Sequence, residues 1–191
     1  MTRLWFVRHG PTYIKAMVGW SDPPAVLDDL PVIRRLTAAL PDHAPLVSSD
    51  LLRAGQTADA ICGDRTRFPD DAGLREIHFG DWEMKGFAEV EADDPSRIRA
   101  FWERPGNISP PNGESWNQTS ARVSRAVDRY IGAGHADIIL VCHFGAILTQ
   151  IQRATGQTAY DTFAQPIDNL SVTQIDVTDE GWALRFANLL P

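Results

Sequence analysis

Residues 137–143, Asp137-Ile138-Ile139-Leu140-Val141-Cys142-His143, decide the fold. An unbroken apolar run of this length between polar residues predicts a strand that is buried on both faces, as in a parallel sheet. Apolar residues at helical spacing follow it, at Ile147, Leu148 and Ile151. A buried strand that leads into a helix is typical of α/β proteins. His143 stands where the strand ends.

The same order of strand and helix occurs elsewhere in the chain. Residues 4–7 and 45–48 are short apolar runs of strand length, and residues 50–61 have helical spacing, with Ser49 placed to cap the helix. The remaining predicted elements are helices at 96–103 and 116–131, the second with a capping box of Ser115 and Gln118, and strands at 170–177 and 182–186 joined by a turn. The Pro-rich segments 23–31 and 104–113 are expected to be loops. We therefore predict an α/β fold, a three-layer α/β/α sandwich with a largely parallel central sheet, as a single domain over residues 1–191.

The composition excludes several classes of protein. With 43% hydrophobic and 23% charged residues the chain is globular, not disordered. A net charge of −7 argues against nucleic acid as a partner. No apolar run approaches the roughly 20 residues of a membrane helix, and the run at 4–7 is too short for a signal peptide. Because two cysteines, Cys62 and Cys142, make no disulfide framework, we expect a cytoplasmic protein without a membrane partner.

Two histidines each follow a predicted strand. His9 ends the first strand and His143 ends the strand at 138–142. Ligands of open α/β sheets bind beyond the carboxyl ends of the strands, so neighbouring strands would bring both imidazoles into one crevice. Arg8 precedes His9, and Arg53 lies in the first turn of the helix that follows the strand at 45–48. Two arginines, two histidines and two helix N-termini predict a site for a tetrahedral dianion such as phosphate.

Five short motifs also occur in the order of a known family. They are Arg8-His9-Gly10, the stretch from Ser49 to Ala58, the stretch from Leu74 to Glu83, Asn112-Gly113-Glu114-Ser115, and Val141-Cys142-His143. Together they span roughly residues 2–155, and each alone has a real rate of false matches. In combination the chain resembles the histidine phosphatase superfamily, which has the phosphoglycerate mutase-like fold.

The resemblance implies a role for each matching residue. His9 would be the nucleophile and form a phosphohistidine, while Arg8, Arg53 and His143 would bind the phosphoryl oxygens. Glu76 would donate a proton to the leaving alcohol and then accept one from the attacking water. These roles agree with the chemistry of imidazole and carboxyl groups. The resemblance implies no metal and no cofactor.

Some positions depart from the common family pattern. Pro11 stands where many members have Glu, and Met84 replaces a frequent Gly. Lys15 stands where many have a phosphate-binding Asn, so an ammonium would make that contact. Thr12 matches and would donate its hydroxyl. Phe144 replaces a frequent Gly after the second histidine and would bind phosphate through its backbone N–H.

The resemblance implies a metal-independent phosphomonoesterase that acts on a small phosphorylated metabolite. Residues 80–85 and 111–114 look most like those of the α-ribazole phosphatase branch, which makes α-ribazole-5′-phosphate the specific candidate substrate. Phosphoglycerate mutases are usually longer, so hydrolysis is favoured over mutase transfer. A mutase, a non-catalytic protein that binds phosphometabolites, and a homodimer stay open. Glu83 and Glu114 are expected either to orient the site or to cap local structure.

Overall fold

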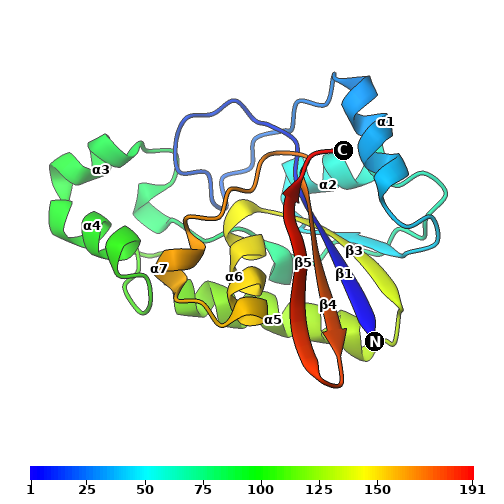
Figure 1. The fold of residues 1–191 in the computed structure, drawn as a ribbon. Helices are drawn as coiled ribbons and strands as arrows, with labels where there is room; N and C mark the ends of the chain where they lie inside the picture. Colours follow the sequence, from blue (N-terminus) through cyan, green and yellow to red (C-terminus); the bar gives the residue numbers. More distant parts are fainter.

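A single five-stranded sheet forms the centre of the computed structural model, which describes residues 1–191 (Figure 1). In spatial order its strands are β2 (Leu46–Ser48), β3 (Asp137–Cys142), β1 (Thr2–Arg8), β4 (Val172–Thr178) and β5 (Gly181–Leu189). β3 pairs in parallel with both β1 and β2, whereas β4 is antiparallel to β1 and to β5. Only β4 therefore runs against the other strands, and the predicted largely parallel sheet is confirmed.

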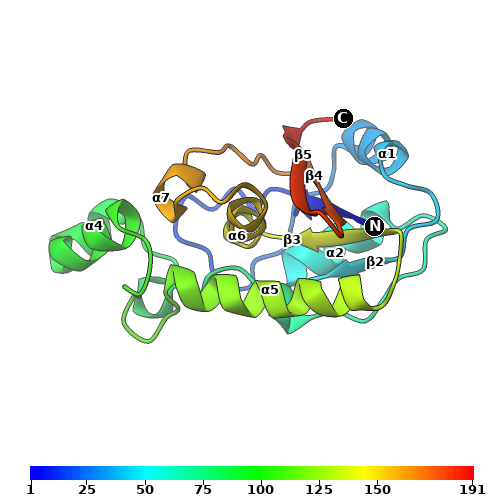
Figure 2. The same cartoon turned by 60° about the horizontal axis from the view of Figure 1, so that its bottom comes forward.

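Helices cover both faces of the sheet. Along β3, Ile138, Leu140 and Cys142 join a core cluster with residues of α5 (Trp116–Gly132) and α6 (Phe144–Thr155). Ile139 and Val141 join a second cluster with residues of α1 (Leu30–Ala39) and α2 (Leu52–Ile61). This division follows from the alternation of side chains along a strand. The predicted three layers are confirmed, and Figure 2 shows α5 running lengthwise along one of them.

The other helices are α3 (Phe87–Asp93), α4 (Pro95–Glu103) and α7 (Ala159–Thr162), which lie to the left of α6 in Figure 1. Single 3₁₀ turns occur at Ala72–Leu74 and Gly80–Trp82. The predicted capping box of α5 is present, because Ser115 Oγ accepts from the backbone N–H of Gln118 and Gln118 Oε1 accepts from that of Ser115. None of the seven helices combines the length and the apolar character needed to cross a bilayer.

Three of the differences from the predicted boundaries have a clear physical cause. The expected loop 23–31 ends in the first turn of α1, where Pro31 loses no hydrogen bond because N–H groups of a first turn have no partner within the helix. Ser49 does not cap α2; the cap residue is Leu51, and Ser49 Oγ accepts from its backbone N–H at 3.3 Å. β4 begins at Val172 and not at 170, because Leu170 has a φ of +61°, which is incompatible with a strand.

Candidate active site

His9 and His143 meet at the carboxyl end of the sheet. Arg8 of β1 lies opposite Cys142 of β3, so the next residue of each strand is a histidine. The backbone N–H of His9 donates to the carbonyl of Cys142 at 3.0 Å. The two imidazole centroids are 5.0 Å apart, and both rings are buried. The parallel pairing of the two strands thus brings the two imidazoles together, as the sequence predicts.

The hydrogen bonds of His9 fix its tautomer. Its Nδ1 lies 2.7 Å from the carbonyl oxygen of Gly10. A carbonyl can only accept, so Nδ1 carries the ring proton. The opposite nitrogen, Nε2, accepts from Nε of Arg53 at 3.3 Å. Nε2 therefore holds the lone pair of the ring and faces the guanidinium group.

Burial and positive neighbours keep both imidazoles neutral. Burial lowers the pKa of His9 to about 3, with a smaller contribution from the charge of Arg53. Burial likewise lowers the pKa of His143, and its neighbours His9 and Arg53 act in the same direction. At neutral pH the Nε2 atom of His9 is consequently free to act as a nucleophile without first losing a proton.

The two arginines are held by backbone carbonyls. Arg8 Nη1 donates to the carbonyl of Ile167 at 2.5 Å, and Arg53 donates to those of Gly19 and Ser21 at 2.7 and 2.9 Å. Burial lowers the pKa of both guanidinium groups, but an arginine stays cationic in proteins. The site therefore concentrates positive charge around neutral imidazoles.

Several buried polar atoms in the site lack a hydrogen-bond partner within the protein. They are both ring nitrogens of His143 and Nε of Arg8. Buried polar groups are nearly always hydrogen-bonded, and leaving one unpaired costs about 1–3 kcal/mol. A ligand with several acceptor oxygens, as phosphate has, would accept from Nε of Arg8 and from the protonated ring nitrogen of His143.

Glu76 enters the site against the first turn of α6. Its carboxylate accepts from the backbone N–H of Ile77 at 2.9 Å and from that of Gly145 at 3.0 Å. The contact needs a glycine, since a Cβ at position 145 would lie 2.4 Å from Glu76 Oε1. The structure therefore places Glu76 beside the segment that begins at His143, and its role as an acid stays a prediction.

The other predicted phosphate ligands, Phe144, Thr12 and Lys15, make fewer contacts with the histidines and arginines of the site. Phe144 is the first residue of α6, and its ring lies 5.5 Å from the guanidinium carbon of Arg8. Thr12 Oγ1 only accepts a long hydrogen bond from Ile14, and Lys15 is exposed. Neither forms a hydrogen bond or ion pair with the arginines and histidines of the site, so their contacts with phosphate stay predictions.

Glu83 organises the loop that Arg53 contacts. Its carboxylate accepts from the backbone N–H groups of Gly19, Trp20 and Ser21 at 2.8–3.1 Å, and also from Ser21 Oγ at 2.7 Å. Burial acts to raise the pKa of Glu83, but these hydrogen bonds outweigh it and the pKa is lowered. From the sequence, Glu83 is expected either to orient the site or to cap local structure. Its contacts fit the first role, because the loop 19–21 that it binds also holds Arg53.

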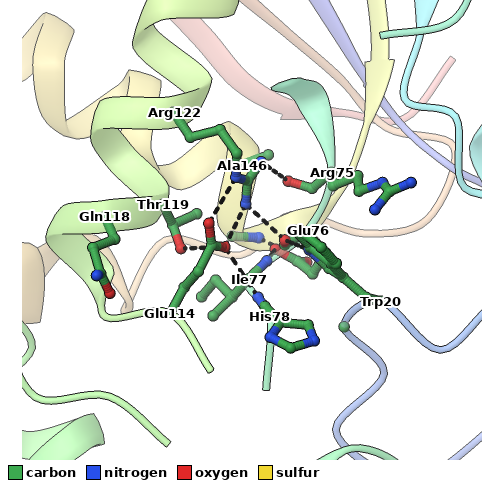
Figure 3. Close-up of polar contacts among 12 residues, drawn as sticks. Trp20, Arg75, Glu76, Ile77, His78, Glu114, Gln118, Thr119, Arg122 and Ala146 are labelled. Atoms are coloured by element: carbon green, nitrogen blue, oxygen red, sulfur yellow. Dashed lines mark hydrogen bonds and ion pairs between the residues drawn. The ribbon is translucent and has the colours of Figure 1, made fainter. Parts of the chain in front are cut away.

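Glu114 forms an ion pair, 2.6 Å long, with Arg122 of α5 (Figure 3). Arg122 also donates to the backbone carbonyl of Glu76. Sequence reasoning missed Arg122, since it is 46 residues from Glu76 and occupies an ordinary helical position.

No group of three or more His, Cys, Asp or Glu side chains is arranged to hold a metal ion.

Comparison with known proteins gives consistent matches. The model of the histidine phosphatase superfamily (branch 1) matches residues 4–189. Adenosylcobalamin/alpha-ribazole phosphatase of Escherichia coli K12 is 28% identical over 97% of this chain and 95% of its own. Glucosyl-3-phosphoglycerate phosphatase of Mycolicibacterium vanbaalenii is 37% identical over 76% of this chain and 70% of its own.

Solved structures agree with the sequence relatives. YhfR of Bacillus stearothermophilus superposes with a TM-score of 0.89 at 26% identity, covering 100% of this chain and 98% of that one. The mycobacterial glucosyl-3-phosphoglycerate phosphatase Rv2419c gives a TM-score of 0.86 at 25% identity, with 100% of both chains covered. The names of the relatives confirm the predicted enzyme class, a phosphoric monoester hydrolase. Because the family model covers nearly the whole sequence, the chain belongs to branch 1 of the histidine phosphatase superfamily.

Proposed function

We propose that this protein hydrolyses a small phosphomonoester through a phosphohistidine on Nε2 of His9. One observation carries the proposal: the Nε2 lone pair of His9 faces Arg53 in a site where His143 and Arg8 have buried polar atoms without a partner. Such an arrangement provides an uncharged nucleophile together with donors for the oxygens of a phosphoryl group.

The proposed reaction has two half-reactions. His9 Nε2 attacks phosphorus, the bond to the leaving oxygen breaks, and protonated Glu76 supplies the proton for the departing alcohol. In the second half-reaction water attacks the phosphohistidine while the Glu76 carboxylate accepts its proton, and the P–N bond breaks. Arg8, Arg53 and His143 stabilise the negative charge of the equatorial oxygens in both steps.

The substrate is the less defined part of the proposal. Relatives named alpha-ribazole and glucosyl-3-phosphoglycerate phosphatases supply two leads. In the sequence comparison the alpha-ribazole phosphatase is matched over 97% of this chain and 95% of its own, so α-ribazole-5′-phosphate is the first specific substrate to test and glucosyl-3-phosphoglycerate is the second. Mutase transfer and binding without turnover are the competing functions.

The test is hydrolysis of p-nitrophenyl phosphate in EDTA by wild type, His9→Asn and the surface control His43→Asn. We expect activity in wild type and in His43→Asn, and none in His9→Asn, with an acid-labile phosphoenzyme trapped only when His9 is present. Activity in His9→Asn would refute the phosphohistidine. Phosphate binding without turnover on a panel of phosphorylated metabolites would favour the non-catalytic alternative, and phosphoryl transfer to a second hydroxyl would favour a mutase.

A further inference from the structure

Every N–H group of Arg122 has a partner near Glu76. Nε and Nη2 donate to the two carboxylate oxygens of Glu114 at 2.8 and 2.6 Å. Nη1 donates to the carbonyls of Gly73 and Arg75 at 3.1 and 2.9 Å, and Nη2 also donates to that of Glu76 at 2.9 Å (Figure 3). These contacts use all five N–H donors of a guanidinium group. Arg122 thus binds three backbone carbonyls of the segment 73–76 that ends in Glu76.

Glu114 binds the backbone on the C-terminal side of Glu76. Its Oε2 accepts from the backbone N–H of His78 and from Thr119 Oγ1, both at 3.2 Å. The segment 73–78 is therefore bound by the arginine before Glu76 and by the carboxylate after it. Both partners of the ion pair are mostly buried, with 16% and 19% of their side chains exposed.

A second side chain also binds the backbone of Glu76. The indole N–H of Trp20 donates to the Glu76 carbonyl at 2.9 Å, so this oxygen receives two hydrogen bonds. The Trp20 ring packs 4.6 Å from the guanidinium carbon of Arg75 and 4.5 Å from the ring of His78. None of these contacts involves the reacting groups directly, which leaves their function unexplained by the mechanism above.

We propose that Arg122 and Glu114 are a positioning pair, which fixes the backbone of residues 73–78 so that the Glu76 carboxyl group reaches the leaving oxygen of the substrate. The inference rests on the proposed function, in which Glu76 is the general acid. Proton transfer requires hydrogen-bond distance, and a displacement near 1 Å can cost about 10²-fold in rate. A lysine keeps the charge at position 122 but cannot bind a carboxylate and three carbonyls at once.

A positioning role predicts a specific dependence on the leaving group. A good leaving group such as 2,4-dinitrophenolate departs without a proton, whereas an alkoxide needs the acid. The quantity to measure is kcat/KM, because it reports only the steps up to formation of the phosphoenzyme. Loss of acid positioning should therefore lower kcat/KM for an alkyl phosphate far more than for 2,4-dinitrophenyl phosphate. A general loss of folded protein would lower both equally.

The experiment compares Arg122→Lys and Glu114→Gln with Glu76→Gln on both substrates. Arg129→Lys is the matched control: Arg129 also lies on α5 and pairs with Asp71 at 2.6 Å, but it does not bind residues 73–78. Since general acids contribute typically 10²–10⁴-fold, we expect kcat/KM for the alkyl phosphate to fall at least about tenfold more than for the dinitrophenyl ester in both variants of the pair. The control should change both substrates alike, by less than about twofold.

The outcomes separate the two proposals. If Glu76→Gln shows no dependence on the leaving group, the proposed role of Glu76 fails. If Glu76→Gln shows it but Arg122→Lys and Glu114→Gln do not, the positioning pair is refuted while the mechanism stands. Should either variant of the pair fail to fold, Trp20→Phe keeps an aromatic ring but removes the other hydrogen bond to the Glu76 carbonyl, and an equal loss on both substrates would overturn the inference.

Discussion

His143 is a buried imidazole that is neutral in the free protein. Its burial and its cationic neighbours disfavour a further positive charge. A phosphate dianion reverses this balance, since it adds two negative charges beside the ring. Binding of the dianion should accordingly raise the affinity of His143 for a proton. An acidic pH optimum would therefore arise in the complex and not in the free protein.

The depressed pKa of His143 has a consequence for stability. In the unfolded chain a histidine gains its proton near pH 6.5, whereas the folded protein resists it. The unfolded state therefore binds more protons below pH 6.5, and stability falls as the pH falls. Urea denaturation of wild type and His143→Gln at pH 7.5 and 4.5 measures this. We expect wild type to lose more stability than the variant over this range; equal losses would contradict the lowered pKa of His143.

Gly145 is the residue whose missing side chain gives Glu76 its place. In Gly145→Ala the new Cβ would meet Glu76 Oε1 at 2.4 Å, so the carboxylate must move. Alanine is otherwise the better helix former by about 1 kcal/mol. We predict that kcat/KM for alkyl phosphates drops by more than about tenfold. Gly132→Ala, at the end of α5 with no atom within 4 Å of a new Cβ, should leave activity unchanged.

At the scale of the element, helix α5 carries both its N-terminal capping box and Arg122, which binds the backbone of Glu76. The capping box closes the first turn directly after Glu114, and Arg122 follows two turns later. Ser115→Ala removes a side chain that pairs with an unsatisfied N–H of that turn, which typically costs about 1 kcal/mol. Urea denaturation should show this loss. Ser120 lies on the same helix and its hydroxyl makes no hydrogen bond, so the unfolding free energy of Ser120→Ala should stay within about 0.5 kcal/mol of wild type. Equal stability of Ser115→Ala and wild type would exclude the cap as a significant contribution.

The elements that local signals define are the ones that the sequence predicts well. β3 is a continuous apolar run, and α5 has both its capping box and an apolar stripe. α1 escaped prediction because its first turn contains Pro31, which indicates a loop when it is seen without the following residues. Ser49 failed as a cap because the chain continues for two more residues before helical geometry begins.

At the scale of the whole molecule, the sheet brings together residues that are far apart in the chain. The convergence of His9 and His143 was predictable, since parallel strands end at one edge. The contacts of Arg53 with the carbonyls of Gly19 and Ser21 were not, because a backbone carbonyl carries no signal in the sequence. The same applies to Arg122, whose partners are set by how α5 packs.

Arg53 joins two parts of the molecule through one side chain. It contacts His9 on β1 and the loop that Glu83 holds, so a ligand bound to it should stabilise the folded protein as a whole. At one hundred times its Kd, a ligand specific for the folded state adds about 2.7 kcal/mol. We predict an increase of this size when inorganic phosphate is added to wild type, measured by urea denaturation at constant ionic strength.

Arg53→Ala tests whether this side chain carries the effect. Each protein is compared with itself, with and without phosphate, so any cost of the substitution itself cancels. The increase in unfolding free energy caused by phosphate should nearly vanish in Arg53→Ala at the phosphate concentration used for wild type. The reason is that the lost guanidinium group is a charged donor to the ligand. Arg185→Ala, which removes an arginine from β5 that pairs with Asp176, should keep the full increment. An undiminished increment in Arg53→Ala would place the anion elsewhere in the molecule and so remove the electrostatic basis of the proposed site.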